Sequence, residues 1–198
     1  PVDIGIAASC KIDGVLDEKI ACGTRNFAKE PAMTEKETLD AIDTGVRLVK
    51  QCKENGYQIL ATGEMGIGNT TTSSAVTAAL LHRLASETAG RGAGLNDKGL
   101  SRKKQVIQEA IDRYDLYKAD AFTVLQTVGG FDIAGLTGVF IGGAMYHVPI
   151  VLDGLISGAA ALLAKRIIPG TEHFMIASHL GKEPAAKAIL KEIGIKPV

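Results

Sequence analysis

A glycine-rich segment at residues 63–74 has the composition of an anion-binding loop. It reads Gly-Glu-Met-Gly-Ile-Gly-Asn-Thr-Thr-Thr-Ser-Ser and is expected to connect a strand to a helix. Glycines allow a sharp turn that presents backbone N–H groups, while the helix N-terminus and the hydroxyls add positive potential and donors. The segment therefore predicts a phosphate site that includes Gly68, Asn69 and Thr70. The alternative is a tight strand-to-helix turn followed by a hydroxyl-rich first helical turn.

Two nucleotide-binding motifs nearly fit this loop. Gly63-x4-Gly68 has the spacing of a Walker A motif, but Asn69 stands where that motif needs a lysine. Gly66-x-Gly68 begins a dinucleotide fingerprint, but Thr71 replaces the third glycine. Because both motifs lose a group that their chemistry requires, we expect a monophosphate ligand and no hydrolysis of nucleoside triphosphates.

Glu64 is an unusual residue for such a loop, since a carboxylate repels a phosphate. It could act as a base, orient a substrate hydroxyl or pair with a nearby cation. The alternative is a carboxylate that accepts hydrogen bonds from neighbouring backbone N–H groups.

A second glycine-rich loop, at residues 90–94, precedes a basic stretch. It reads Gly-Arg-Gly-Ala-Gly and is followed by Lys98, Arg102, Lys103 and Lys104. Flexible glycines beside clustered cations suit the capture of a phosphate or a carboxylate. A solvated basic turn is the alternative interpretation.

Two further loops follow expected strands. Asp153 could hold a ribose hydroxyl or cap the helix that follows it. His179 could be catalytic, although a hydrogen-bonded structural histidine is the simpler interpretation. The remaining histidines have no partner at metal-ligand spacing, so we expect no metal site.

Short apolar runs alternate with segments of helical periodicity, which predicts an α/β fold with a mainly parallel sheet and helices on both faces. We expect one domain over residues 1–198. Ligands of such sheets bind at the carboxyl ends of the strands, here in loops 63–70, 153–158 and 178–184. The expected strands are 4–8, 57–62, 148–152 and 174–177, and the expected helices are 34–55, 70–87, 154–167 and 184–192, with others beginning at Ser101, Asp120 and Asp132.

Local signals refine these elements. Thr34 and Glu37 have the spacing of a capping box at the start of a helix. Gly135, Gly138 and Gly142 recur at helical spacing, which would let another backbone come close.

The composition excludes several classes of protein. Twenty-two basic residues balance 22 acidic ones, and aromatic residues make up 5% of the 198 residues. We therefore expect no nucleic-acid or membrane partner. The three cysteines, Cys10, Cys22 and Cys52, form no C-x-x-C pair, which favours reduced thiols in the cytoplasm. No apolar run reaches the roughly 18 residues of a membrane span.

The run from Gly63 to Thr71 closely resembles a signature of the nicotinate-nucleotide–dimethylbenzimidazole phosphoribosyltransferase family, which acts in assembly of the lower ligand of cobalamin. The resemblance runs nearly end to end, because further segments follow in the family's order. They are Gly23-Thr24-Arg25-Asn26, Glu30-Pro31-Ala32-Met33-Thr34, residues 90–94, Lys103-x-x-Val106-Ile107, Gly129-Gly130 and Leu152-Asp153-Gly154.

The resemblance implies a Rossmann-like α/β domain, a small helical domain that is mostly absent here, and a homodimer. It implies transfer of 5-phosphoribose from nicotinate mononucleotide to 5,6-dimethylbenzimidazole or a related base, without a metal or cofactor. It assigns phosphate or ribose contacts to Gly66, Gly92 and Lys103. It places Glu64 near the ribose and the acceptor base, and Gly181 and Lys182 near the nucleotide, although the family pattern has a serine near Gly181.

Members of the family are longer at both ends. They continue into a Leu-Gly-Glu-Gly-Thr-Gly segment whose glutamate is the principal base, whereas this chain stops at Val198. We therefore expect nucleotide binding with little turnover from this chain alone, with Glu64 in a supporting role. The alternative is a non-catalytic nucleotide-binding fragment or subunit that needs a partner chain.

Overall fold

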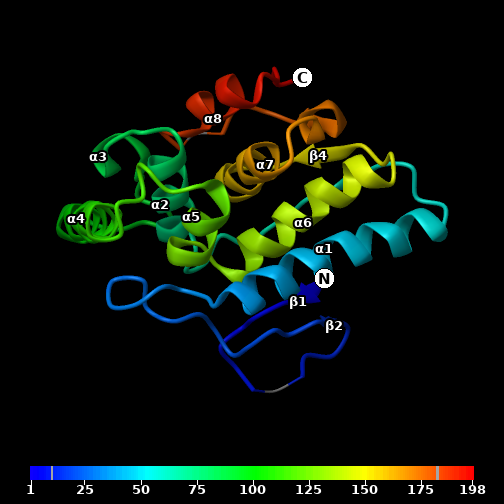
Figure 1. The fold of residues 1–198 in the computed structure, drawn as a ribbon, viewed down its shortest axis with the longest axis horizontal. Coiled ribbons are helices and arrows are strands. Elements are labelled where there is room, and N and C mark those ends of the chain that lie inside the picture. Colours follow the sequence, from blue (N-terminus) through cyan, green and yellow to red (C-terminus); the bar gives the residue numbers. More distant parts are fainter. Residues whose placement is uncertain (10, 182) are drawn as a thin grey trace.

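The computed structural model describes residues 1–9, 11–181 and 183–198 (Figure 1). Parallel strands and helices alternate along much of the chain, so the α/β class is confirmed. The elements in chain order are β1 (Val2–Asp3), β2 (Leu16–Asp17), α1 (Glu35–Glu54), β3 (Leu60–Ala61), α2 (Thr70–Leu80), α3 (Ala85–Thr88), α4 (Asp97–Arg113), α5 (Ala121–Val128), α6 (Phe131–Met145), β4 (Ile150–Leu152), α7 (Leu155–Ile167), the 3₁₀ helix η1 (Thr171–Phe174), β5 (Met175–Ala177) and α8 (Ala186–Ile193).

The strands form two small sheets. β1 pairs with β2, and β4 lies between β3 and β5. Every pairing is parallel, with Leu60 opposite Ile150 and Val151 opposite Ile176. Because β3, β4 and β5 are each followed by a loop and then a helix, the loops after these strands gather at one edge of the sheet.

Helix α7 is the centre of the core. Residues 155–164 are all buried, and the helix contacts α2, α5, α6 and α8. Small side chains such as Ala159 and Ala161, both fully buried, let these helices approach it closely. In Figure 1, α7 lies between α8 and α6, with α1 beyond α6.

Helices α1 and α6 pack with their backbones in contact. A Cβ atom on Gly45 would lie 2.0 Å from the carbonyl oxygen of Gly135, and one on Gly142 would lie 3.0 Å from Val49 Cβ. The prediction that Gly135, Gly138 and Gly142 admit a close backbone is therefore confirmed, and α1 is the helix they admit.

Several local predictions are also confirmed. Thr34 and Glu37 form the expected capping box at the start of α1. Asp120 caps α5, because its side chain accepts a hydrogen bond from the N–H of Thr123 at 2.9 Å.

The first strand was predicted in the wrong place. It covers residues 2–3 instead of 4–8, because the Asp3 carboxylate accepts hydrogen bonds from the N–H groups of Gly5 (3.1 Å) and Ile6 (2.9 Å). These bonds bend the chain and end the regular pairing, although the carbonyl oxygens of Ile4 and Gly5 still accept hydrogen bonds from the N–H groups of Ile20 (3.0 Å) and Gly23 (3.1 Å). β3 is also shorter than the predicted strand over 57–62.

Four helix ends differ from the prediction. The helix expected over 70–87 stops at Leu80, because His82 adopts a left-handed conformation with φ 51°, and α3 follows separately.

Asn96 caps α4, so Ser101 lies inside that helix. α6 begins after Gly130, which places Asp132 in its first turn. α8 begins at Ala186, beyond Pro184.

Candidate active site

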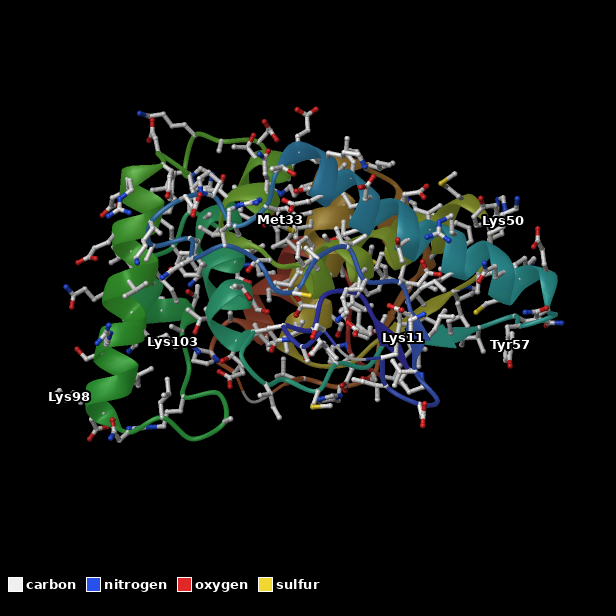
Figure 2. All side chains as sticks on the ribbon, turned by 90° about the horizontal axis from the view of Figure 1, so that it is seen from below. Lys11, Met33, Lys50, Tyr57, Lys98 and Lys103 are labelled. Atoms are coloured by element: carbon white, nitrogen blue, oxygen red, sulfur yellow. The ribbon has the colours of Figure 1, made fainter. Side chains whose placement is uncertain are left out.

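Lys103 joins the two glycine-rich loops. Its side chain projects from α4 toward α2, and only 6% of the residue is exposed (Figure 2). The ammonium group donates hydrogen bonds to Thr70 Oγ1 and to the carbonyl oxygen of Gly90, both at 3.0 Å. Two loops that are distant in sequence therefore meet at one buried cation.

The electrostatics of Lys103 suit an anionic ligand. Burial lowers the pKa of the ammonium below its usual value, while the negative charge of Glu183 acts in the opposite direction. An ammonium carries three donors, and the two hydrogen bonds to Thr70 and Gly90 use two of them. A phosphate beside Lys103 could accept a hydrogen bond from the third donor, and its negative charge would offset the cost of burying the ammonium.

Two glycines of the loop at residues 90–94 lie where a side chain would meet a neighbouring segment. Gly92 has φ 54°, and a Cβ atom there would lie 2.5 Å from Thr70 Oγ1. A Cβ atom on Gly90 would lie 1.8 Å from Glu183 Oε2. The loop thus lies directly against the start of α2 and against the segment after β5.

The first glycine-rich loop turns through two left-handed residues, Gly66 (φ 78°) and Gly68 (φ 83°). The half-buried Glu64 carboxylate accepts a hydrogen bond from the N–H of Gly66, which is the local bonding weighed as the alternative for this residue. The side chains of Met65 and Ile67 are 82% and 73% exposed. The loop therefore presents apolar groups beside backbone donors, a combination that suits a ring attached to a phosphate.

Asn69 occupies the N-cap position of α2 without capping it. Its side chain is buried and donates instead from Nδ2 to Asp132 Oδ2 at 2.6 Å. Burial raises the pKa of Asp132, and the nearby charge of Glu64 raises it further. The sequence predicted Asp132 only as the start of a helix. Its position beside the first glycine-rich loop was not predicted.

The remaining predicted residues lie after β4 and β5. Asp153 is exposed, and Gly154 occupies the N-cap position of α7, so Asp153 does not cap that helix. His179 is exposed with Nδ1 2.9 Å from Ser178 Oγ, and Gly181 approaches Ala186. The prediction for Lys182 lies outside the described residues.

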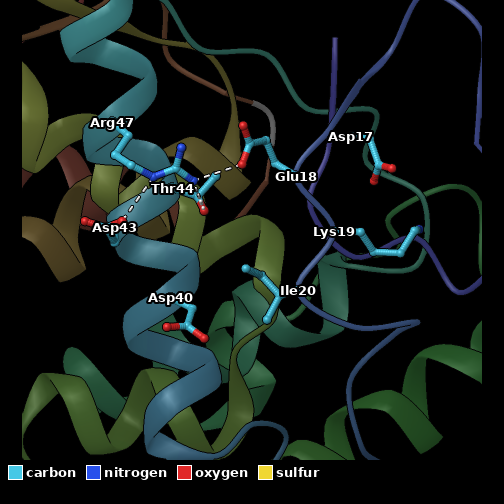
Figure 3. A pocket seen from close by; sticks show the side chains of 8 residues that line it. All are labelled: Asp17, Glu18, Lys19, Ile20, Asp40, Asp43, Thr44 and Arg47. Atoms are coloured by element: carbon cyan, nitrogen blue, oxygen red, sulfur yellow. Dashed lines mark hydrogen bonds and ion pairs between the residues drawn. The ribbon is translucent and has the colours of Figure 1, made fainter.

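A separate hollow lies between residues 17–20 and helix α1 (Figure 3). Arg47 at its wall is held by Glu18 at 2.9 Å and by Asp43 at 3.1 Å. Lys19 pairs with the buried Asp3 at 2.6 Å. The two cations of this hollow lie in ion pairs with carboxylates. The hollow is therefore a poorer phosphate site than the contact of Lys103 with Thr70 and Gly90, which we call the Lys103 cluster.

Other classes of site receive no support from the part of the chain that the structure describes. No group of three potential metal ligands occurs there. Cys22 and Cys52 are free thiols, and Cys10 lies outside the described residues. No helix among the described residues is long and apolar enough to cross a membrane.

The fold and the Lys103 cluster define a parallel α/β protein with glycine-rich loops gathered after the carboxyl ends of its strands. The model of the phosphoribosyltransferase family matches residues 1–198. The chain belongs to the phosphoribosyltransferase family.

Known proteins are similar to this chain over nearly its whole length. The nicotinate-nucleotide–dimethylbenzimidazole phosphoribosyltransferase of Clostridium perfringens is 42% identical over 196 residues, which is 99% of this chain and 54% of that protein. The enzyme of the same name from Acetivibrio thermocellus is 45% identical over 197 residues, covering 100% of this chain and 56% of that protein.

A solved structure agrees with the fold. The crystal structure of CobT from Thermus thermophilus superimposes with a TM-score of 0.93 at 35% identity, covering 100% of this chain and 59% of that one. The chain thus spans about half the length of the curated relatives that it matches.

Proposed function

We propose that the whole protein transfers 5-phosphoribose from nicotinate mononucleotide to 5,6-dimethylbenzimidazole or a related base. The products are α-ribazole 5′-phosphate and nicotinate, and the reaction belongs to assembly of the cobalamin nucleotide loop. The names of the relatives support this substrate pair. The observation that carries the proposal is the convergence of Thr70, Gly90 and Lys103, because it supplies a buried cation for the phosphate.

In this proposal the phosphate lies between the ammonium of Lys103 and the first turn of α2. Gly92 lets its loop close against Thr70, and Gly66 and Gly68 turn the other loop toward the same ligand. Asn69 and Asp153 lie at the two loop ends that flank the nucleotide, and Gly181 follows β5, while a contact from Lys182 is proposed from the family resemblance alone. These assignments explain why glycines and one buried lysine dominate the site.

The reaction requires little acid catalysis. A nitrogen of the acceptor attacks C1′, the bond from C1′ to nicotinate breaks, and its electron pair neutralises the cationic pyridinium nitrogen. The other acceptor nitrogen must lose a proton, so a general base is needed. We assign Glu64 a supporting role near the ribose and leave the principal base to the family's Leu-Gly-Glu-Gly-Thr-Gly segment.

Calorimetry tests the binding step with this chain. We expect nicotinate mononucleotide to bind and nicotinate riboside, which lacks the phosphate, to bind at least about tenfold more weakly, since one charge-assisted contact is lost. Equal affinity for the two ligands, or no heat and no thermal shift at millimolar nucleotide, would contradict the proposal.

The protein's wider setting is also a proposal. We propose small-molecule substrates, a homodimer and a place in the cytoplasm, in line with the family. Light scattering of the purified protein measures the assembly. Nucleotide binding together with stable co-purification of a different polypeptide would favour the alternative of a non-catalytic nucleotide-binding subunit.

A further inference from the structure

The pair Asn69–Asp132 links the first turns of two helices that are 63 residues apart in sequence. An asparagine at the N-cap position normally accepts a hydrogen bond from a backbone N–H of its own helix. Here the Asn69 side chain turns away from α2 and donates to Asp132, which stands in the first turn of α6. The contact thus fixes the start of α2 relative to α6.

This pair is costly for the fold. Asn69 is only 8% exposed, and its Oδ1 is buried without a hydrogen-bond partner among the described residues. The Asp132 residue is half-buried, and the charge of Glu64 lies near its carboxyl group. A polar pair that leaves one buried oxygen without a hydrogen bond adds little net stability. Its geometry, in contrast, is closely defined, which suits a role in positioning.

The contact leads directly to the proposed phosphate site. Thr70 follows Asn69 in the chain, and Thr70 Oγ1 accepts the hydrogen bond from Lys103 at 3.0 Å. Asp132 itself is unsuited to contact a phosphate, because both groups are anionic. Its influence on the ligand must therefore pass through Asn69.

We propose that Asp132 is a positioning residue that acts through Asn69 to hold Thr70 and Lys103 in the geometry that binds the phosphate of a nucleoside monophosphate. This inference rests on the proposed function, since it names the device that prepares the same site. It predicts that the hydrogen bond between the two side chains matters for affinity, whichever of the two carries the charge.

A reciprocal exchange tests this. Asn69→Asp sets two carboxyl groups against each other, Asp132→Asn leaves two amides, and the double variant restores one amide and one carboxylate in exchanged places. Calorimetry with nicotinate mononucleotide gives the affinity of each protein, and thermal unfolding gives its stability. We expect Asn69→Asp to weaken binding at least about tenfold, because the donor to Asp132 is lost, and Asp132→Asn by about threefold or more, because the bond to a charged acceptor becomes a weaker bond between two amides.

The double variant decides between positioning and other roles. We expect its affinity to exceed that of Asn69→Asp by about threefold or more, because the bond is restored with opposite polarity, while the carboxylate now at residue 69 still repels the phosphate in part. Asp120→Asn is the matched control, since it makes the same change at the start of α5, and its affinity should not change.

Each other outcome has a defined meaning. Unaltered affinity in both single variants, or a double variant as weak as Asn69→Asp, overturns the inference while leaving the proposed function intact. If Asn69→Asp does not fold, Asp132→Asn and the double variant decide in the same way. No binding by the unaltered chain overturns the proposed function and this inference together.

Discussion

A Cβ atom on Gly138 would lie 1.9 Å from the carbonyl oxygen of Ile42, so α6 and α1 touch backbone to backbone at this point. The obstacle is a main-chain atom inside a helix, which cannot rotate away as a side chain would. An alanine at position 138 must therefore push the two helices apart. We expect Gly138→Ala to lower the free energy of unfolding by about 3 kcal/mol or more, at the upper end for overpacked cores. Urea denaturation measures this change.

Gly158→Ala is the matched control for that substitution. Gly158 lies inside α7, and a Cβ atom there would lie 3.4 Å from Ile189 Cγ2, which is an ordinary contact. Because alanine is the better helix former, we expect this variant to be neutral or to gain up to about 1 kcal/mol. A loss at position 158 as large as that at 138 would show that helix packing is not the cause.

Glu37 makes the start of α1 sensitive to acid. The Arg25 guanidinium, together with the N–H and hydroxyl of Thr34, lowers the pKa of Glu37 to about 2 from 4.5. A carboxyl group whose pKa is lowered by folding stabilises the fold at pH values above the pKa it has in the unfolded chain. This contribution is lost as the pH falls from about 4.5 to about 2. Glu37→Gln should therefore lower stability at neutral pH by about 1–2 kcal/mol and flatten the acid side of the stability profile.

Glu35→Gln serves as the comparison for Glu37, because it removes an exposed acid from the same helical turn. Its stability profile should keep the slope of the unaltered chain between pH 4.5 and 2. The same flattening in both variants would assign the effect to the helix dipole instead of the contact with Arg25.

Local signals in the sequence account for much of the fold. The capping box at Thr34 and the glycine spacing around Gly138 each depend on residues within a few turns of one another, so a pattern reveals them. Strand positions depended on longer contacts. The side chain of Asp3, for example, turns the chain before the strand predicted at 4–8 can form.

The same distinction holds for the site. The composition of two loops predicted an anion site, and the wider family resemblance pointed to Lys103. The partners of these groups were not predicted. Asn69 contacts Asp132, which lies 63 residues further along the chain, and Gly90 lies against Glu183, which is also distant in sequence. No periodicity or spacing encodes such contacts, since they depend on how the helices pack.

Gly92 tests whether the second loop must lie against α2. A Cβ atom at this position would meet Thr70 Oγ1 at 2.5 Å, the atom that accepts from Lys103. We expect Gly92→Ala to weaken binding of nicotinate mononucleotide by about tenfold or more, because displacing Thr70 lengthens a hydrogen bond to a buried cation. Calorimetry at equal protein concentration measures the loss.

Gly94→Ala separates this clash from backbone strain. Gly94 also has a positive φ, 110°, but no atom lies within 4 Å of a Cβ built there. We expect its stability to fall while its affinity changes by less than about threefold, since the strain lies away from Thr70. An affinity loss equal to that of Gly92→Ala would mean that loop strain alone disturbs the site.

Lys103 should link nucleotide binding to pH. Burial lowers the pKa of its ammonium in the folded chain, so the unfolded chain binds more protons between that lowered pKa and 10.5. The stability of the free protein should therefore rise with pH across this window, while affinity for the nucleotide should fall as the ammonium loses its proton. Lys103→Met should remove both slopes and weaken binding by about 10- to 100-fold. Lys98→Met removes an exposed lysine at the outer end of the same helix (Figure 2) and should keep both slopes. Full affinity in Lys103→Met would place the phosphate elsewhere.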